Sequence, residues 1–144
     1  MTANQLSIFM ENKSGQLVKV TELLKNINID IRAMSLADTK DFGIIRMIVS
    51  DCETAQKALR EKGFLSTITK VLCIALDDTT GSLSNITELF ANAAININYL
   101  YACITVIGKN AYIIMHVDDE AKACEVLTKA NIKLVTDKEL KNLA

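Results

Sequence analysis

The stretch "ENKSGQLVKVTELL" at residues 11–24 has a counterpart, "DDTTGSLSNITELF", at residues 77–90. In both stretches a short polar segment ends in a glycine, and the run that follows has apolar residues at helical spacing. A glycine at this point allows backbone conformations that other residues rarely adopt. The two stretches therefore predict a duplicated unit in which a loop leads into a helix.

The duplication extends over most of the chain. An offset of 66 residues aligns the following identical residues: Gly15 and Gly81, Leu17 and Leu83, Thr21 and Thr87, Glu22 and Glu88, Leu23 and Leu89, Asn26 and Asn92, Ile29 and Ile95, Ile31 and Ile97. Beyond "DTKDFG" and "VIGKNA", where a hairpin can change length, an offset of 68 aligns six more: Ile45 and Ile113, Met47 and Met115, Val49 and Val117, Asp51 and Asp119, Ala55 and Ala123, Leu59 and Leu127. We interpret the chain as two homologous domains, residues 1–69 and 70–144.

Each repeat has the same order of predicted elements. The strands of the first repeat are "LSIFM", "IDIRAMSL", "GIIRMIV" and "FLSTI", and those of the second are "VLCIAL", "ININYLYACITV", "AYIIMHV" and "IKLV". A helix follows the first and the third strand of each repeat. Asp51 and Asp119 are suited to cap the second helices, and Gly63 and Asn131 to end them. The order predicts an α+β fold of two ferredoxin-like βαββαβ repeats, with helices on one face of each antiparallel sheet.

The sheet face away from the helices also carries apolar residues. In the third strands these are Ile44 and Ile48 in the first repeat and Tyr112 and Ile114 in the second. Because units of about 70 residues are marginally stable alone, we expect this face to be covered and the protein to form a homodimer or a larger assembly.

Composition excludes several classes of protein. A formal net charge of -1 gives no electrostatic reason to expect nucleic acid or an anionic membrane as a partner. No apolar run reaches the roughly 20 residues of a membrane span, and "MTANQLSIF" does not resemble a signal peptide, so we expect a cytoplasmic protein. The four cysteines lack zinc-site spacing and are interpreted as buried free thiols, with no cofactor or metal.

The glycine loops suggest a ligand with a carboxylate. The first amides of a helix point outward at the positive end of its dipole, which suits an anion. Asn12 and Asp78, three residues before each glycine, can accept from an ammonium group. Asp30 and Asn96 stand fifteen residues after the glycines. In the alternative interpretation the glycines only relieve strain, and the polar residues satisfy loop amides or cap the start of a strand.

Two stretches, "ENKSGQLVKVTELLKNINIDI" and "LDDTTGSLSNITELFANAAININYL", resemble the ACT domain family. The resemblance covers nearly the whole chain as a tandem pair. It implies a regulatory module that binds an amino acid or another small ligand between two copies. By position it implies the following ligand-binding residues: Asn12, Gly15, Asp30, Asp78, Gly81 and Asn96. Ser14 and Thr80 of the same loops are further ligand-binding candidates. The family often has proline before the glycine; here Ser14 and Thr80 take that place, and either hydroxyl can cap the helix that follows.

The sequence favours a regulator over an enzyme. His116, the single histidine, has no nucleophile or carboxylate placed beside it by the pattern and is interpreted as an interface residue. The leading hypothesis is an amino-acid-binding protein that controls a partner enzyme in trans. The alternative is a subunit without a ligand that assembles with a larger biosynthetic enzyme. Because the copies exchange Asn and Asp at both polar positions, we expect one better and one degraded site.

Overall fold

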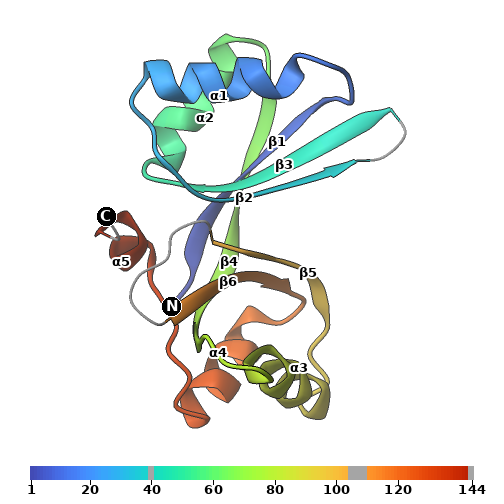
Figure 1. Ribbon diagram of the computed structural model, residues 1–144, viewed down its shortest axis with the longest axis vertical. Helices are drawn as coiled ribbons and strands as arrows, with labels where there is room; N and C mark the ends of the chain where they lie inside the picture. The colour runs from blue at the N-terminus through green and yellow to red at the C-terminus, as the bar shows by residue number, and fades with distance from the viewer. Residues whose placement is uncertain (39–40, 104–109, 143–144) are drawn as a thin grey trace. The chain divides into compact units, whose positions relative to one another are not determined.

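The computed structural model describes residues 1–38, 41–103 and 110–142 (Figure 1). The chain forms two compact units, one of Asn4–Thr69 and one of Met1–Ala3 with Lys70–Ala144. We call them the first and the second unit. Two predicted segments lie partly outside the described residues. These are the hairpin "VIGKNA", at residues 106–109, and the strand before it, at residues 104–106.

The first unit has the predicted βαββαβ order. Its elements are β1 (Ala3–Glu11), α1 (Gln16–Asn26), β2 (Ile31–Asp38), β3 (Phe42–Val49), α2 (Cys52–Glu61) and the beginning of β4 (Leu65–Asp77). The strands lie in the order β2-β3-β1-β4, and β3 is antiparallel to both β1 and β2. Figure 1 shows α1 and α2 together on one face of these strands.

The second unit repeats this arrangement. It contains the rest of β4, then α3 (Ser82–Asn92), β5 (Ile97–Ala102), β6 (Asn110–Val117), α4 (Glu120–Lys129) and a short α5 (Asp137–Asn142). The strand order is β4-β6-β5, with both pairs antiparallel. Both repeats have a register shift at the start of the first hairpin strand, between Ile31 and Ala33 in β2 and between Ile97 and Tyr99 in β5. The two shifts occupy equivalent positions at the offset of 66. The predicted fold of two ferredoxin-like repeats is confirmed.

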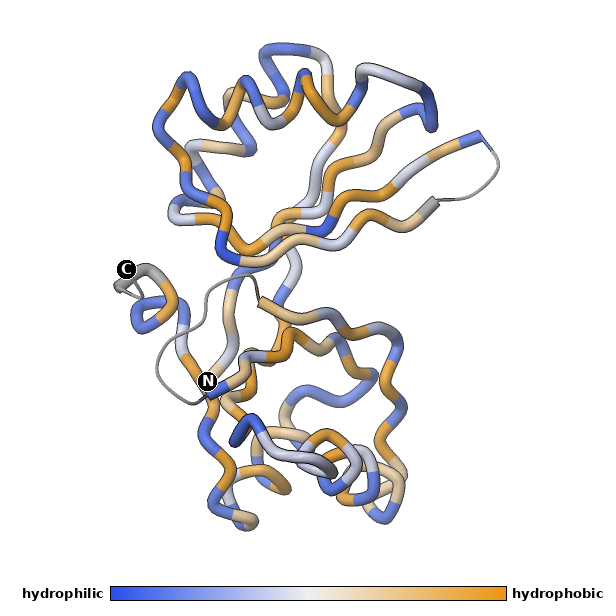
Figure 2. The backbone as a smooth tube through the Cα atoms, viewed as in Figure 1, coloured by the Kyte–Doolittle hydropathy of each residue, from blue (hydrophilic) through white to orange (hydrophobic). Residues whose placement is uncertain are grey.

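Apolar side chains at helical spacing attach each helix to its sheet. In α1 these are Val20 and Leu24, and in α3 Ile86 and Phe90, all at most 1% exposed. They pack on the helix-facing strand positions, among them Ile45 and Met115. Figure 2 shows hydrophobic and hydrophilic residues alternating along the helices as this amphipathic pattern requires.

The second helices begin and end as predicted. Oδ1 of Asp51 accepts from the amides of Glu53 and Thr54, and Oδ1 of Asp119 accepts from that of Lys122. Gly63 follows α2 with φ 83°, and Asn131 follows α4 with φ 55°, so both adopt the left-handed conformation.

The region between the two repeats differs from the expected two strands. Apart from Phe64, "FLSTI" and "VLCIAL" are parts of one continuous strand, β4, of 13 residues. Thr69 and Lys70, which join them, provide no turn residue, so the extended backbone simply continues. The last predicted strand, "IKLV", is reduced to one bridge between Ile74 and Leu134, with Val135 donating to the carbonyl oxygen of Cys73 at 2.8 Å.

The sheet positions that face away from the helices are largely buried. Ile48, Tyr112 and Ile114 are at most 8% exposed, and Ile44 is half-buried.

Cys52 and Cys73 are buried as predicted, whereas Cys103 and Cys124 are half-buried; all four are free thiols. None of the helices within the described ranges has the length and apolar composition needed to cross a bilayer.

Candidate functional site

Both glycine loops end in a residue with left-handed backbone. Gly15 has φ 87° and Gly81 φ 94°, and each is the N-cap of the helix that follows. Neither helix has a side-chain cap, so the prediction that the hydroxyls of Ser14 and Thr80 cap them is wrong. Because the glycines themselves take the N-cap position, these hydroxyls stand one residue too early to reach the N2 and N3 amides.

The first turns of α1 and α3 therefore expose backbone donors. In α3 the amide of Ser82 donates to the carbonyl oxygen of Thr79 at 3.2 Å, and that of Asn85 to Gly81 at 3.0 Å. Between them, the amides of Leu83 and Ser84 have no acceptor among the residues that the structure describes. The same holds for Leu17 and Val18 in α1, judged over the same ranges. Free amides at the positive end of a helix dipole attract an anion such as a carboxylate.

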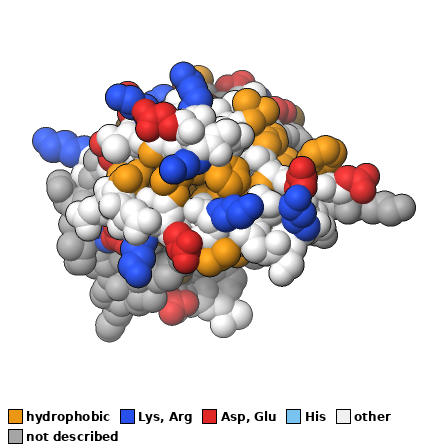
Figure 3. All heavy atoms as spheres, turned by 90° about the horizontal axis from the view of Figure 1, so that it is seen from above, with side chains coloured by type: hydrophobic (Ala, Val, Ile, Leu, Met, Phe, Trp, Pro, Cys, Tyr) orange, Lys and Arg blue, Asp and Glu red, His pale blue; other side chains and the backbone are white. Residues whose placement is uncertain are grey.

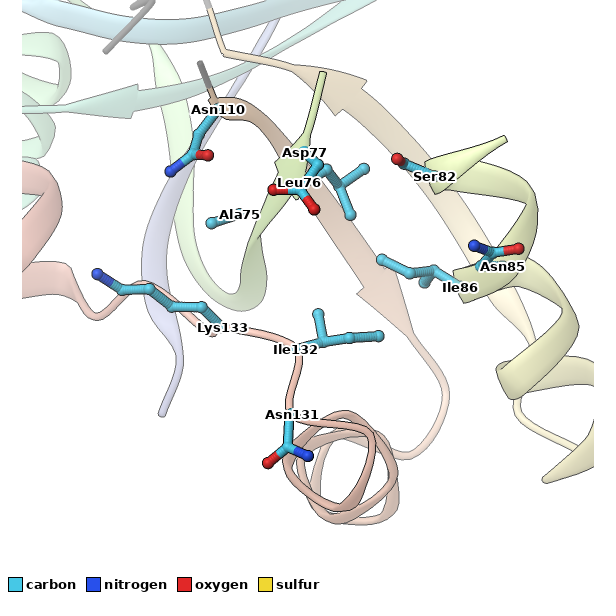
Figure 4. A pocket seen from close by; sticks show the side chains of 10 residues that line it. All are labelled: Ala75, Leu76, Asp77, Ser82, Asn85, Ile86, Asn110, Asn131, Ile132 and Lys133. Carbon is cyan, nitrogen blue, oxygen red and sulfur yellow. The ribbon is translucent and has the colours of Figure 1, made fainter. Parts of the chain in front are cut away.

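A cavity of about 290 Å³ opens beside the beginning of α3 (Figure 4). Figure 4 shows the side chains of Leu76, Ile86 and Ile132 turned towards one another as an apolar floor. Polar residues from four separate segments form the rim: Asp77 of β4, Ser82 and Asn85 of α3, Asn110 of β6, and Asn131 and Lys133 after α4. An apolar floor with a few convergent polar groups is typical of small-molecule sites.

The first unit has a cavity of about 330 Å³ at the equivalent place. Its lining consists of Phe9, Met10, Glu11, Gln16, Phe42, Gly63, Phe64 and Leu65. At the offsets of 66 before the hairpin and 68 after it, every one of these residues corresponds to a residue that lines the second cavity. The duplication has therefore preserved the cavity as well as the fold.

The predicted loop residues lie close to the cavities without lining them. Asn12, Ser14, Gly15, Asp78, Thr80 and Gly81 are all exposed. The backbone of Asn12 is tied to the next hairpin, since its amide donates to the carbonyl oxygen of Asp41 at 3.1 Å. The cavity begins one residue after each glycine, at Gln16 and at Ser82.

Asp30 and Asn96 lie at the other end of their repeats. A helix of 11 residues, about 16 Å long, separates each of them from the glycine of its own repeat. The carboxylate of Asp30 is 3.0 Å from the guanidinium of Arg32, and Nδ2 of Asn96 donates to Oδ1 of Asn98 at 2.9 Å. Within one repeat, the structure does not bring these residues together with the loop; their role in binding stays a prediction.

His116 belongs to a polar cluster rather than to a catalytic group. Its ring stacks on the ring of Tyr99, its partner across the strands, with centroids 5.0 Å apart and planes 6° from parallel. Its Nδ1 is 2.9 Å from Nδ2 of Asn98. Within the described residues no three His, Cys, Asp or Glu side chains are placed to hold a metal ion.

Sequence reasoning missed the rim of the cavity. Asn110 and Lys133 each stand alone in the sequence, and Asn131 was interpreted only as the end of a helix, so no local motif marks them as site residues. A comparison of the two repeats could have pointed to this position. Where one repeat has a polar residue and the other an apolar one, as at Asn110 and Phe42, the position does not follow the apolar pattern that the repeats share in their cores.

Comparisons with known proteins identify the family of the chain. The family described as an ACT domain pair matches residues 1–144, and the chain belongs to this family. The crystal structure of protein BT0572 from Bacteroides thetaiotaomicron is similar, with 36% identity, a TM-score of 0.91, and coverage of 98% of this chain and 96% of that one. No curated protein matches the chain.

More distant solved structures share the fold. The ligand-free regulatory subunit of aspartate kinase from Thermus thermophilus has 13% identity and a TM-score of 0.62, over 88% of this chain and 91% of that one. The corresponding subunit from Thermus flavus has 14% identity and a TM-score of 0.60, over 89% and 92%. The prediction of a tandem ACT protein, a member of a family of regulatory domains, is confirmed.

Proposed function

We propose that this protein is an amino-acid-binding regulator that controls a partner enzyme in trans. The observation that supports the proposal is the combination, in each unit, of unpaired helix-start amides and an adjoining cavity. The amides supply an anion site for the carboxylate, and the cavity has the size of a small-ligand pocket. Ligand binding favours one conformation of the protein, and the partner responds to the shift in population.

The proposal is tested by thermal unfolding of the purified protein in the presence of each standard amino acid at millimolar concentration. A ligand that binds only the folded state raises the unfolding midpoint by mass action. At a ligand concentration of about 100 times the Kd, the free energy of unfolding increases by about 2.7 kcal/mol. For a chain of this length that corresponds to a rise of roughly 5–10 °C. A selective rise identifies the ligand; no rise with any amino acid contradicts the proposal.

Gly81 allows a matched pair of variants. Both Gly81→Asp and Gly81→Asn place a side chain of the same shape at φ 94°, with nothing within 4 Å of the added Cβ. Their backbone strain is therefore similar, of the order of 1–2 kcal/mol. Only the aspartate adds a negative charge beside the free amides, so we expect it to abolish binding of the carboxylate while the asparagine variant retains more affinity. Equal affinities in the two variants would show that the glycine loop does not contact the ligand.

The alternative, a subunit that assembles with a larger enzyme without binding a metabolite, is favoured by the exposed apolar side chains Phe42 and Leu65. It predicts no response to amino acids and tight copurification with a larger protein.

We also propose that the protein self-associates as a homodimer. Light scattering after gel filtration distinguishes a monomer of 15.8 kDa from a dimer.

A further inference from the structure

The two equivalent cavities differ in chemistry at their rims. The position of Asn110 in the second unit is Phe42 in the first, and the position of Lys133 is Leu65. The position of Ala75 is likewise Phe9. The acidic residue at the end of the first strand of each repeat is retained, as Asp77 in the second unit and Glu11 in the first.

Three apolar residues of the first-unit cavity are exposed. Phe42 is 62% exposed, Leu65 69% and Phe9 38%, and they belong to the small set of large apolar residues at the surface of the described chain. Seen from above, the surface of the first unit carries apolar side chains among its charged residues (Figure 3). Contact of such groups with water is unfavourable, and a molecule that covers them gains free energy.

The fold itself does not require apolar residues at these positions. The second unit builds the equivalent strand β6 and an equivalent cavity with the polar residues Asn110 and Lys133. The apolar character of Phe42 and Leu65 is therefore a property of the first cavity alone, and it is suited to an occupant with an apolar surface.

We propose that the first-unit cavity is a side-chain pocket that selects an amino acid with an apolar side chain, and that its second-unit counterpart disfavours such a side chain. This inference rests on the proposed function. The volume of about 330 Å³ matches the lower end of small-ligand pockets, roughly 300–1,000 Å³. Gln16, which lines the cavity, is followed by the free amides of Leu17 and Val18, so a bound carboxylate and an apolar side chain lie within one site.

A small ligand fits this place better than a protein partner. A stable protein interface buries about 800 Å² on each side, which three exposed apolar side chains do not supply. The two cavities also have nearly the same volume, about 290 Å³ in the second unit and about 330 Å³ in the first. That similarity is expected if both cavities hold molecules of one size class and differ in the side chain that they accept.

The test exchanges the rims while the full chain is retained. In the double variant Phe42→Asn and Leu65→Lys, the first cavity receives the residues of the second. Both replaced side chains are more than half exposed, so the fold should tolerate the change. Leu36→Lys, at another exposed apolar residue of the same unit (53%) outside the cavity, is the matched control.

Affinities are measured by calorimetry with two pairs of similar shape, L-leucine against L-asparagine and L-valine against L-threonine. We expect the native protein and the Leu36→Lys variant to prefer the apolar member of each pair. The double variant should bind L-leucine about tenfold more weakly, the effect of losing some 60 Å² of apolar contact, with little change for L-asparagine.

Each contrary outcome has its own meaning. If the native protein binds amino acids without preferring the apolar members, or if the double variant keeps that preference, the inference is wrong while the proposed function stands. If the double variant changes only self-association or the capture of a protein partner, the apolar residues belong to an interface and the inference is also wrong. If no amino acid binds the native protein, the proposed function fails and this inference with it.

Discussion

The amide of Asn96 donates a hydrogen bond of 3.0 Å to Oδ1 of Asp118, and the amide of Asp118 donates back to the carbonyl oxygen of Asn96 at 3.2 Å. In the first repeat, Asp30 and Ser50 form the same reciprocal pair, with the hydroxyl of Ser50 as the acceptor at 3.1 Å. Each pair fixes the start of the second strand of its repeat to the end of the third.

This pairing predicts a stability difference between two truncations. Asp118→Ala removes a charged acceptor from the amide of Asn96 and should lower the free energy of unfolding by about 1 kcal/mol, because water replaces only part of the interaction. Ser50→Ala removes a neutral acceptor and should cost less. Urea denaturation measures both. Asp118→Asn keeps an acceptor oxygen and is expected to lie between the native protein and Asp118→Ala; equal losses in the two Asp118 variants would show that the hydrogen bond is not the cause.

The two N-caps of the second helices should also differ in their contributions. The carboxylate of Asp51 accepts from two amides at 3.1 Å each and from the hydroxyl of Thr54 at 2.8 Å. That of Asp119 accepts from a single amide, that of Lys122, at 3.0 Å. We expect Asp51→Ala to cost about 1–2 kcal/mol and Asp119→Ala about half as much, measured by chemical denaturation. Asp51→Asn, which keeps a capping oxygen, is the control, and an order reversed between the two alanine variants would contradict the reasoning.

The beginning of α5 should be sensitive to acid. The amide and the hydroxyl of Thr136 donate to Glu139, and with Lys133 nearby they hold the pKa of this carboxyl below its usual value of 4.5. A group whose pKa is lower in the folded state stabilises the fold above its unfolded pKa, and this contribution is lost as the pH falls through the folded pKa. The stability advantage of the native protein over Glu139→Gln should therefore be constant at neutral pH, begin to fall below about pH 4.5 and be lost once the pH has passed the lower folded pKa. Urea midpoints of both proteins between pH 7 and pH 3 measure it, and a difference that does not change with pH contradicts the assignment.

The cysteines should react in a defined order. The thiol of Cys103 is half-buried, and a hydrogen bond from Cys73 lowers its pKa. The pKa of Cys73 is raised by the same hydrogen bond and by burial, and burial also raises that of Cys124. Since the thiolate is the reactive species, iodoacetamide should label Cys103 first in the native protein. Peptide mass spectrometry after short exposure tests this order; faster labelling of Cys73 would contradict it, and labelling in denaturant should remove the difference between the sites.

Local patterns in the sequence were sufficient where the cause of a structure is local. The left-handed glycines, the caps at Asp51 and Asp119 and the apolar spacing of Val20 and Leu24 each depend on neighbours within a few residues. The capping box of α5, Thr136 with Glu139, was equally readable in "TDKE", although the helix itself was not predicted. The predicted hydroxyl caps failed because one residue of offset decides whether an oxygen can reach an amide.

The sequence by itself determined the duplication, the order of strands and helices in each repeat as far as its second helix, and the apolar faces of the helices, because the repeat register and the hydrophobic period can be read along the chain. Only the tertiary structure decided which polar residues share a site. Asp77, Asn110 and Lys133 meet at one cavity because Asp77 pairs with Asn110 across β4 and β6, and the carbonyl oxygen of Lys133 accepts from the amide of Ala75 in β4. Gly81 and Asn96, fifteen residues apart, are separated by the full length of a rigid helix. Proximity along the chain and proximity in space differ wherever a helix or a strand pairing lies between them, and the chemistry of the site depends on proximity in space.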